Sequence, residues 1–406
     1  MVKFRHSILT AMPAQKKGPT GFRPTRVEVN LDNLSHNICE AKKFLKSGTL
    51  FMAIVKADAY GHGAVESSKL FLHNGADWLG VATLSEAQEL RNADIKAPTL
   101  ILGYTPDEQF TELLDTDIRP AIYDVDQAKA LNKIVKQGSK KIPIHIKIDT
   151  GLSRLGFLPN DESIKKIVSI SQLKGLELEG IFTHFATSGA EDKSYTKMQF
   201  QRFMWVVEKL EGEGINIPLK HVSNSSAIVE IPEYDLSMVR GGTILYGLDP
   251  YENSNKEKIF LPAFTLKSRL SHVKTVQAGT GIGYGLTYTT AKMSKIGTLP
   301  IGYVDGYRYS LAKRGSVEVQ GHRAPIVGVI AMDQLMIDLT GIEGVKIGDE
   351  VTLIGYAKEG VPSVNEVAEW GDTFSHELLC AISRRVPRVY VSKGKIKRVV
   401  DYLLQC

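Results

Sequence analysis

A lysine at the end of an apolar run is the first residue whose position suggests chemistry. Residues 52–56 read Met-Ala-Ile-Val-Lys, and the polar segment 57–63 follows. A lysine that closes a buried strand is usually solvated. In a dry pocket, its pKa would fall below the usual value of about 10.4, and the neutral amine could form a Schiff base with a carbonyl compound. Position alone leaves both interpretations of Lys56 open.

Polar residues also gather at the ends of four later apolar runs. One histidine or arginine in such a place is more often a structural hydrogen-bonding group than a catalyst. Clusters at four successive strand ends are hard to explain by packing. Some of the clustered residues are small or carry a hydroxyl, and such residues let backbone N–H groups approach a phosphate closely. In chain order, the clusters are Lys147 to Arg154, Thr183 and His184, His221 to Ser226, and Arg240 to Thr243.

Strand-like and helix-like patterns alternate around these clusters. Residues 27–31 alternate apolar and polar side chains like a half-buried strand, and Asp32 is a plausible N-cap for the helical pattern that follows. Helical patterns recur at residues 84–91, 125–136 and 196–210. Eight strand–helix units within the first 255 residues match the size of a (β/α)8 TIM barrel, and a doubly wound open sheet is the alternative. The eight predicted strands are residues 52–56, 78–82, 99–102, 120–123, 144–149, 178–183, 219–223 and 236–240.

From Phe260 onward the pattern changes to short strands separated by turn residues, which is typical of an all-β domain. The polar segment 253–258 is the natural boundary. We therefore predict an α/β chain with three parts: a tail over 1–25, a barrel over 26–255 and a mainly β domain over 256–406. The predicted β-domain strands are residues 268–276, 296–300, 317–319, 326–332 and 350–353.

The amino-acid composition argues against several classes of protein, among them nucleic-acid-binding and membrane-spanning proteins. Of 406 residues, 43% are hydrophobic and 23% charged, which is ordinary for a globular protein. The net charge of +5 comes from six basic residues among the first 26, so the rest offers no basic field for nucleic acid. No apolar window is long enough to span a membrane, and Cys39, Cys380 and Cys406 form no CxxC pair. We expect a cytoplasmic protein with a solvated tail, the alternative for the tail being an organellar transit peptide.

Other motifs are weak. The segment 281–285, Gly-Ile-Gly-Tyr-Gly, lacks the GxGxxG spacing and lies in the β-rich part, so it does not predict a nucleotide loop. The ten histidines show no ligand spacing, and we expect no metal site.

Taken together, these segments closely resemble the alanine racemases, a fold-type III family of pyridoxal-phosphate enzymes. The lysine signature also occurs in related non-catalytic barrel proteins, and barrel decarboxylases share the general architecture, but the β-domain segments favour the racemases. The similar segments occur in family order at residues 54–63, 147–157, 183–186, 221–225, 238–250, 284–285, 300–306, 331–338 and 383–390.

The resemblance implies a fold and an assembly. A barrel precedes a mainly β domain, and strand 27–31 packs into the second domain. Two chains form a head-to-tail homodimer, in which the β domain of each completes the active site of the other. The substrate is alanine, whose L and D forms are interconverted, and the product supplies D-alanine for cell-wall synthesis.

The resemblance also implies two catalytic bases. Lys56 holds pyridoxal 5'-phosphate and serves one face of the substrate. Tyr284 of the partner subunit serves the other, and its phenol must be tuned below a pKa near 10. His221 matches the histidine that hydrogen-bonds this tyrosine, and Arg154 matches the arginine that contacts the phenol and the substrate carboxylate.

The remaining matches concern cofactor and substrate. Arg240 faces the pyridine nitrogen, to which a guanidinium can only donate, so the nitrogen should stay unprotonated. His184 supports the ring, and Lys147 falls where many relatives carry a carbamylated lysine. Residues matching the phosphate site are Tyr60, Asn224, Ser225, Gly242 and Thr243, and those matching substrate-side positions are Tyr303, Met332 and Asp333, with Met332 supplied by the partner.

Departures from the family pattern concern specificity. Arg384 stands where several relatives place a tyrosine that touches the phosphate, and we expect it to bind the cofactor or to enlarge the pocket. Thr243 and Gly241 replace a common aliphatic residue and a common proline. The alternative function is therefore a broader racemase that acts on serine or other small amino acids.

Overall fold

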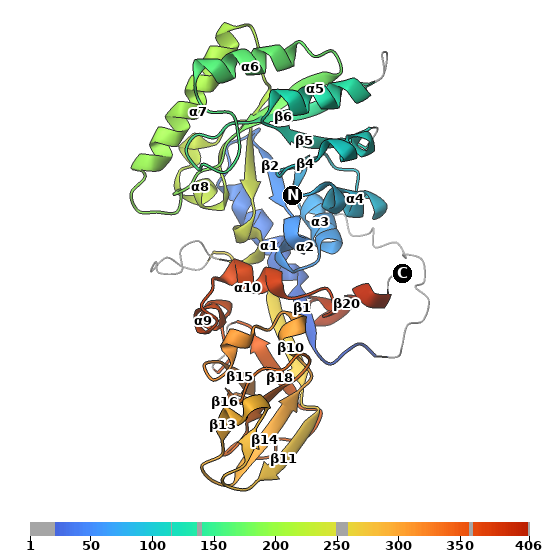
Figure 1. Ribbon diagram of the computed structural model, residues 1–406, viewed down its shortest axis with the longest axis vertical. Coiled ribbons are helices and arrows are strands. Elements are labelled where there is room, and N and C mark those ends of the chain that lie inside the picture. The colour runs from blue at the N-terminus through green and yellow to red at the C-terminus, as the bar shows by residue number, and fades with distance from the viewer. Residues whose placement is uncertain (1–20, 115, 136–139, 249–258, 357–359, 405–406) are drawn as a thin grey trace, which may run out of the picture.

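The computed structural model describes residues 21–114, 116–135, 140–248, 259–356 and 360–404. Figure 1 shows a barrel of strands and covering helices at one end and a β-rich domain at the other, with helices α9 (Val364–Trp370) and α10 (Ser375–Ala381) near their junction. No helix among the described residues is long and apolar enough to cross a membrane.

The first domain is a parallel barrel, as predicted. Its sheet runs in the order β8-β7-β6-β5-β4-β3-β2-β9, and the amide of Arg240 on β9 donates to the carbonyl of Ser223 just after β8 (3.1 Å), which brings the ends of the sheet together. An open doubly wound sheet would lack this closure. The strands are β2 (Leu50–Ile54), β3 (Trp78–Val81), β4 (Thr99–Ile101), β5 (Ile118–Ile122), β6 (Ile142–Lys147), β7 (Leu176–Phe182), β8 (Leu219–His221) and β9 (Met238–Gly241).

Helices cover the outside of the barrel, and side-chain caps start several of them. Thr83 forms a capping box with Glu86, and Asp124 and Asn160 cap the helices that follow them. The predicted N-cap Asp32 is wrong: Asn30 accepts from the Asn33 amide, because the helix begins one residue after it. The helices are α1 (Leu31–Lys43), α2 (Lys56–Tyr60), α3 (Ala64–His73), α4 (Leu84–Asn92), α5 (Val125–Ile134), α6 (Asp161–Ser171), α7 (Ser194–Gly212) and α8 (Ser225–Glu230).

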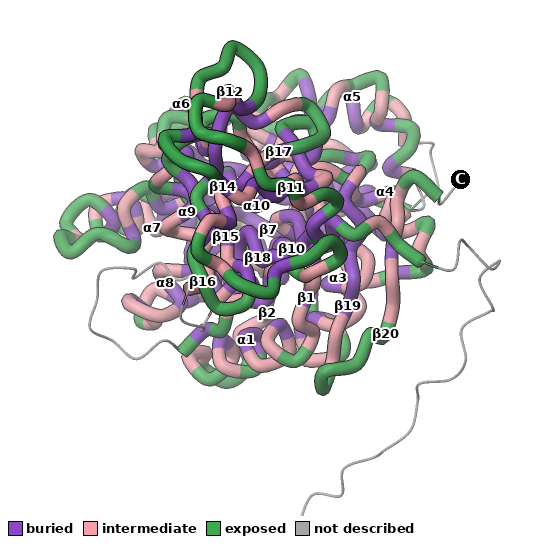
Figure 2. Tube along the Cα trace, turned by 90° about the horizontal axis from the view of Figure 1, so that it is seen from below, coloured by how far each residue is buried: buried purple, intermediate pink, exposed green. Residues whose placement is uncertain are grey.

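The second domain is built on a ten-stranded sheet. Strand β1 (Arg26–Asn30) pairs antiparallel with β10 and parallel with β19, so the first strand of the chain lies in this sheet. Figure 2 views this domain end-on, with buried strands at its centre and an exposed loop near β12. The other strands are β10 (Phe264–Arg269), β11 (His272–Val276), β14 (Ser294–Leu299), β15 (Ser316–Val319), β16 (His322–Val327), β17 (Leu335–Asp338), β18 (Glu350–Ile354), β19 (Arg388–Ser392) and β20 (Lys395–Val400); β12 (Gly281–Ile282) and β13 (Tyr288–Thr289) form a small ribbon.

Two strand predictions in this domain need correction. The run 268–276 is two strands, because the chain turns at Leu270 and Ser271 before β11 pairs with β14. The run 326–332 ends at Val327, and the partner strand β17 was not predicted. Strands β19 and β20 were also missed.

Contacts at the junction fix the domains to each other. The buried guanidinium of Arg388 donates to four carbonyls, among them that of Gly61 in the barrel (2.9 Å). Tyr402 donates to the Asp58 carboxylate at 3.0 Å. The second domain thus holds the turn that follows Lys56.

The predicted tail lies mainly outside the described residues, as does the predicted boundary at 253–258. Its last part is corrected by the structure. Arg23 forms a bidentate ion pair with the buried Asp305 and donates to the Pro300 carbonyl (2.8 Å). Thr25 is fully buried against Ser268. Residues 23–25 therefore pack with the β domain.

A buried carboxyl just before β9 makes stability depend on pH. Burial raises the pKa of Asp235 to about 6, and the nearby Ser223 hydroxyl offsets this only in part. A raised pKa means that the folded state binds the proton more tightly than the unfolded state does. Stability therefore begins to fall when the pH rises above the pKa of Asp235 in the unfolded chain, and the loss is complete once the pH exceeds its pKa in the folded protein.

We expect Asp235→Asn to raise Tm near pH 8 by about 2 °C or more, since about 1 kcal/mol corresponds to 2–4 °C in a domain of this size. The gain should vanish near about pH 4, where the wild-type carboxyl is protonated. Thermal melts across this range, with the exposed Asp126→Asn as control, measure it. A Tm difference independent of pH would contradict the assignment.

Candidate active site

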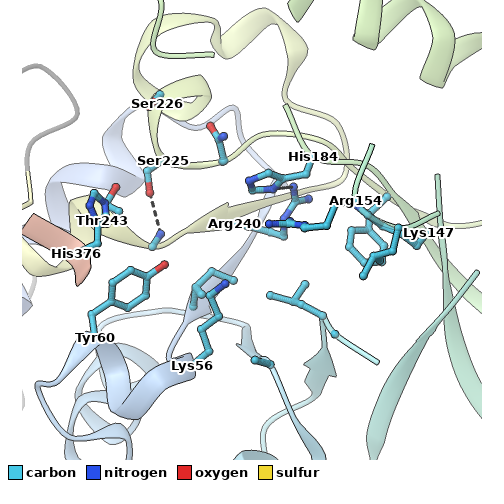
Figure 3. Close-up of a pocket in the computed structure, with 18 residues that line it drawn as sticks. Lys56, Tyr60, Lys147, Arg154, His184, Ser225, Ser226, Arg240, Thr243 and His376 are labelled. Atoms are coloured by element: carbon cyan, nitrogen blue, oxygen red, sulfur yellow. Dashed lines mark hydrogen bonds between the residues drawn. The ribbon is translucent and has the colours of Figure 1, made fainter. Parts of the chain in front are cut away.

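A cavity of about 480 Å³ opens at the carboxyl ends of the barrel strands. Figure 3 shows its lining, in which Lys56 and Tyr60 after β2 and Arg240 and Thr243 at the end of β9 surround one space. The structure brings together many of the predicted site residues here: Lys56, Tyr60, Lys147, Arg154, His184, Asn224, Ser225, Arg240, Gly242 and Thr243.

Lys56 lies at the start of a left-handed turn rather than at the end of a strand. Strand β2 ends at Ile54, and residues 57–60 all have φ between 52° and 54°. Such a conformation costs about 1–2 kcal/mol for each non-glycine residue, so neighbours must hold it. Glu86 accepts from the Ala57 amide (2.7 Å), and Asp58 accepts from the Ala64 amide (2.9 Å). The tight turn fixes where the Lys56 side chain begins.

The environment of Lys56 favours its neutral amine. Burial lowers the pKa of Lys56, and the nearby Arg154 guanidinium lowers it further, with Glu86 opposing them. A larger fraction of the amine is therefore unprotonated at neutral pH than in a surface lysine, and it is available as a nucleophile or base.

Hydroxyl groups surround Gly242 at one side of the cavity. A Cβ at this position would lie 3.1 Å from the Tyr60 hydroxyl and 3.7 Å from the Ser225 hydroxyl. The Gly242 amide donates to Ser225 (2.9 Å), and Thr243 lines the cavity beside them. This hollow is kept open by the missing side chain and is lined by groups able to bind an anion.

Arg240 lies at the other side and is almost entirely buried. Its Nη atoms donate to the carbonyls of Thr183 (2.8 Å), His221 (3.0 Å) and Val222 (3.0 Å), which compensate its charge. Burial lowers its pKa to about 9, and Arg154 adds to this, so the guanidinium stays protonated at neutral pH. Nη2 also lies 3.4 Å from Nδ1 of His184.

The role predicted for His221 is wrong. Its Nδ1 accepts from Arg240 (2.9 Å) and its Nε2 lies 2.9 Å from His145, so both ring nitrogens are engaged. The ring is fully buried and does not line the cavity. His221 therefore cannot hydrogen-bond an incoming tyrosine, whereas His184 lines the cavity.

Lys147 is a second buried amine beside this cavity. Burial lowers its pKa well below the usual value, and the cations Arg240 and Arg154 lower it further. Its Nζ lies 4.4 Å from the centre of the Phe182 ring. These surroundings favour the neutral amine of Lys147 over its charged form.

One titratable side chain that lines the cavity was not predicted. His376 comes from α10 of the second domain, and its ring lies 6.2 Å from that of Tyr60. Burial lowers its pKa. No strand-end pattern precedes it in the sequence, and only the docking of the two domains brings it to the cavity.

The remaining predicted site residues do not line this cavity. Tyr284, Tyr303 and Met332 belong to the second domain and are 76%, 44% and 51% exposed. Tyr284 and Tyr303 each begin a short 3₁₀ helix. Asp333 pairs with Arg385 (2.6 Å). Arg384 is also placed differently from the prediction: it pairs with Glu89 (2.7 Å) and Asp58 (3.2 Å) and lies over the Tyr402 ring, so two carboxylates hold its charge away from the hollow.

Comparisons with known proteins agree with this geometry. The chain matches the family models for the alanine racemase N-terminal domain over residues 29–250 and C-terminal domain over residues 263–390. It is 45% identical to alanine racemase 2 of Caldanaerobacter subterraneus subsp. tengcongensis, covering 94% of this chain and 98% of that protein. It is 47% identical to alanine racemase of Methanococcus maripaludis, covering 91% and 99%.

Solved structures give the same result. Alanine racemase of Clostridium difficile 630 superimposes with a TM-score of 0.90 at 42% identity, covering 95% of this chain and 100% of that one. The Bacillus anthracis alanine racemase with bound L-Ala-P has a TM-score of 0.90 at 35% identity, covering 96% and 100%. The chain belongs to the alanine racemase family.

Proposed function

We propose that this protein interconverts L-alanine and D-alanine with pyridoxal 5'-phosphate as cofactor and so supplies D-alanine for cell-wall synthesis. The observation that supports this most strongly is the cavity itself. A partly buried amine, a buried guanidinium and a hollow of hydroxyls converge at the carboxyl ends of the strands in a chain of the alanine racemase family.

The residues present fit the proposed cofactor. The phosphate would lie in the hollow at Gly242, against Tyr60, Ser225 and Thr243, where a Cβ would obstruct it. Arg240 would face the pyridine nitrogen and Lys56 the aldehyde. When bound, pyridoxal phosphate withdraws electrons from the amino acid's α-carbon, which makes the α-proton acidic enough to remove.

The protein's own groups then move the proton. The depressed pKa of Lys56 suits a base that takes the α-proton from one face of the substrate. Arg154, which lines the cavity, would bind the substrate carboxylate. The return of a proton on the opposite face needs a second group, and we assign it to Tyr284.

Tyr284 belongs to a partner's site in this proposal. It lies beside β12 and β13, at the end of the molecule far from the barrel in Figure 1. Its exposure groups it with other exposed apolar side chains of the second domain, which is typical of a surface that another chain covers. In a head-to-tail homodimer, the partner's Tyr284 would enter the cavity near His184, with the partner's Met332 beside it, and Tyr303 and Asp333 would lie on the substrate side. The exposed set includes Tyr284, Leu286, Met293, Tyr303, Val304 and Met332.

The direct test is chiral chromatography of single amino acids incubated with cofactor-loaded protein. We expect L- and D-alanine to interconvert, and Lys56→Ala to lower kcat by about 10³-fold or more, since a general base contributes 10²–10⁴-fold. The exposed Lys133→Ala is the control. A loaded protein that racemises no amino acid would refute the proposal, and equal rates on serine would favour the broader racemase.

Mixing two inactive variants tests the shared site. Lys56→Ala and Tyr284→Phe dimers should both lose racemisation. After subunit exchange, mixed dimers contain one complete site, so activity should return to about one quarter of wild type, because half of the dimers are mixed and each has one of two sites intact. Exchange without any recovery would mean that Tyr284 acts in its own chain, and a fully active Tyr284→Phe dimer would mean that Tyr284 is not a catalytic base.

We further propose that Lys147 is carbamylated. Its neutral amine would add CO₂ and release a proton, and the carbamate formed would pair with Arg154, one of the cations that lower the pKa of this amine. Removal of CO₂ from the buffer should lower the racemisation rate several-fold, and bicarbonate should restore it, because Arg154 loses its counter-ion. Lys147→Gln should be insensitive to both treatments. Intact-protein mass spectra that never show the added CO₂, together with an unchanged rate, would overturn the assignment.

A further inference from the structure

A line of hydrogen-bonded polar side chains leads from the cavity into the barrel interior, and all but the last, Glu179, are buried. The Arg240 Nη1 atom lies 2.9 Å from Nδ1 of His221, and Nε2 of His221 lies 2.9 Å from Nδ1 of His145. Nε2 of His145 lies 3.4 Å from Oε2 of Glu179. These four side chains come from β9, β8, β6 and β7 and connect end to end.

Apolar side chains fill much of the barrel interior around this line, so the line is not a default of packing. Met52, Leu100 and Met238 are fully buried there. Both histidines are also fully buried, and the chain makes room for one of them: a Cβ at Gly180 would lie 2.3 Å from the His145 ring. Because buried polar groups cost free energy unless they are hydrogen-bonded, the line must be fully paired.

The donor at one end fixes the protons along the line. A guanidinium only donates hydrogen bonds, so Nδ1 of His221 must be unprotonated, and the imidazole proton of His221 must be on Nε2. That proton is donated to Nδ1 of His145, whose own proton is then on Nε2 and points at Glu179. Protonation of either ring at its second nitrogen would set two donors against each other. Burial lowers the pKa of both rings, in agreement with neutral imidazoles.

The acceptor at the other end is held as a carboxylate. Arg119 donates to Glu179 from Nε (2.8 Å) and Nη2 (3.0 Å). Burial alone would raise the pKa of Glu179, but hydrogen bonds from His145 and Arg119 bring it down to about 2. The carboxylate therefore accepts from His145 throughout the physiological pH range.

We propose that Glu179 and His145 are positioning residues that orient Arg240 toward the cofactor through His221. They keep Nδ1 of His221 unprotonated, so that this nitrogen can accept a hydrogen bond from Nη1 of Arg240 and hold the guanidinium inside the barrel. The Nε atom of Arg240 has no hydrogen-bond partner among the described residues and is left for the pyridine nitrogen. If the line were cut, His221 could adopt the other tautomer, and its Nδ1–H would push the guanidinium out of place. The part concerning the cofactor rests on the proposed function.

The first test uses cofactor-free protein and needs no activity. In protein labelled with ¹⁵N-histidine, we expect NMR to show His221 and His145 protonated at Nε2 and bare at Nδ1. Glu179→Gln and His145→Phe should each shift His221 to a mixture of protonation states. The phenyl ring suits the aromatic surroundings of Trp78 and Phe182, so His145→Phe keeps the test open if Glu179→Gln folds poorly. Thr99→Val, a buried change in β4 away from the line, is the matched control.

The second readout separates positioning from packing. In the two variants we expect kcat to fall about tenfold, since loss of a partner that orients a ligand-binding group costs 10–100-fold, with KM for alanine changed less than the kcat. Thr99→Val should change neither. The inference is overturned if wild-type His221 is protonated at Nδ1, if the variants leave its signals unchanged, or if their kcat matches that of Thr99→Val. If wild-type protein racemises nothing, the proposed function fails, while the NMR signals still decide how Arg240 is held.

Discussion

Four basic side chains meet at one end of the barrel, where burial, together with their mutual repulsion, governs the protonation state of the lysines. Arg154 and Arg240 keep their charge because a guanidinium loses its proton only with great difficulty. The two lysines are the groups that yield: burial and the arginines lower the pKa of both Lys56 and Lys147. Burial, reinforced by this repulsion, therefore favours the neutral, nucleophilic form of both amines.

The fold keeps this arrangement in place from three directions. Parallel strands bring their carboxyl ends, and the residues after them, to one rim. The left-handed turn after Lys56 is hydrogen-bonded to Glu86 of the barrel. Its own residue Asp58 accepts hydrogen bonds from Tyr402 and Arg384 of the second domain. From below, a hydrogen-bonded line through the barrel supports Arg240. Disruption of the turn, the junction or the line should therefore alter the same few atoms.

Much of the site could be predicted because its residues follow buried strands, which are recognisable in sequence. Lys56, Arg154 and Arg240 were found in this way together with the family resemblance. His376 could not be found, since α10 reaches the cavity only through domain docking. The error at His221 has a related cause. The family resemblance was matched to one of two histidines near neighbouring strand ends, and the sequence does not say that His184 faces the cavity while His221 points into the barrel. Likewise, β19 was missed because its pairing with β1 joins residues far apart in sequence.

The central claim is that the Lys56 amine is the group that bonds to the cofactor. Reduction of the pyridoxal-phosphate-loaded protein with borohydride, followed by peptide mapping, tests it most directly. The account predicts a stable adduct on the peptide that contains Lys56 and none on the peptide that contains Lys147. An adduct on Lys147 or on a surface lysine instead, or no adduct in protein that racemises alanine, would contradict it.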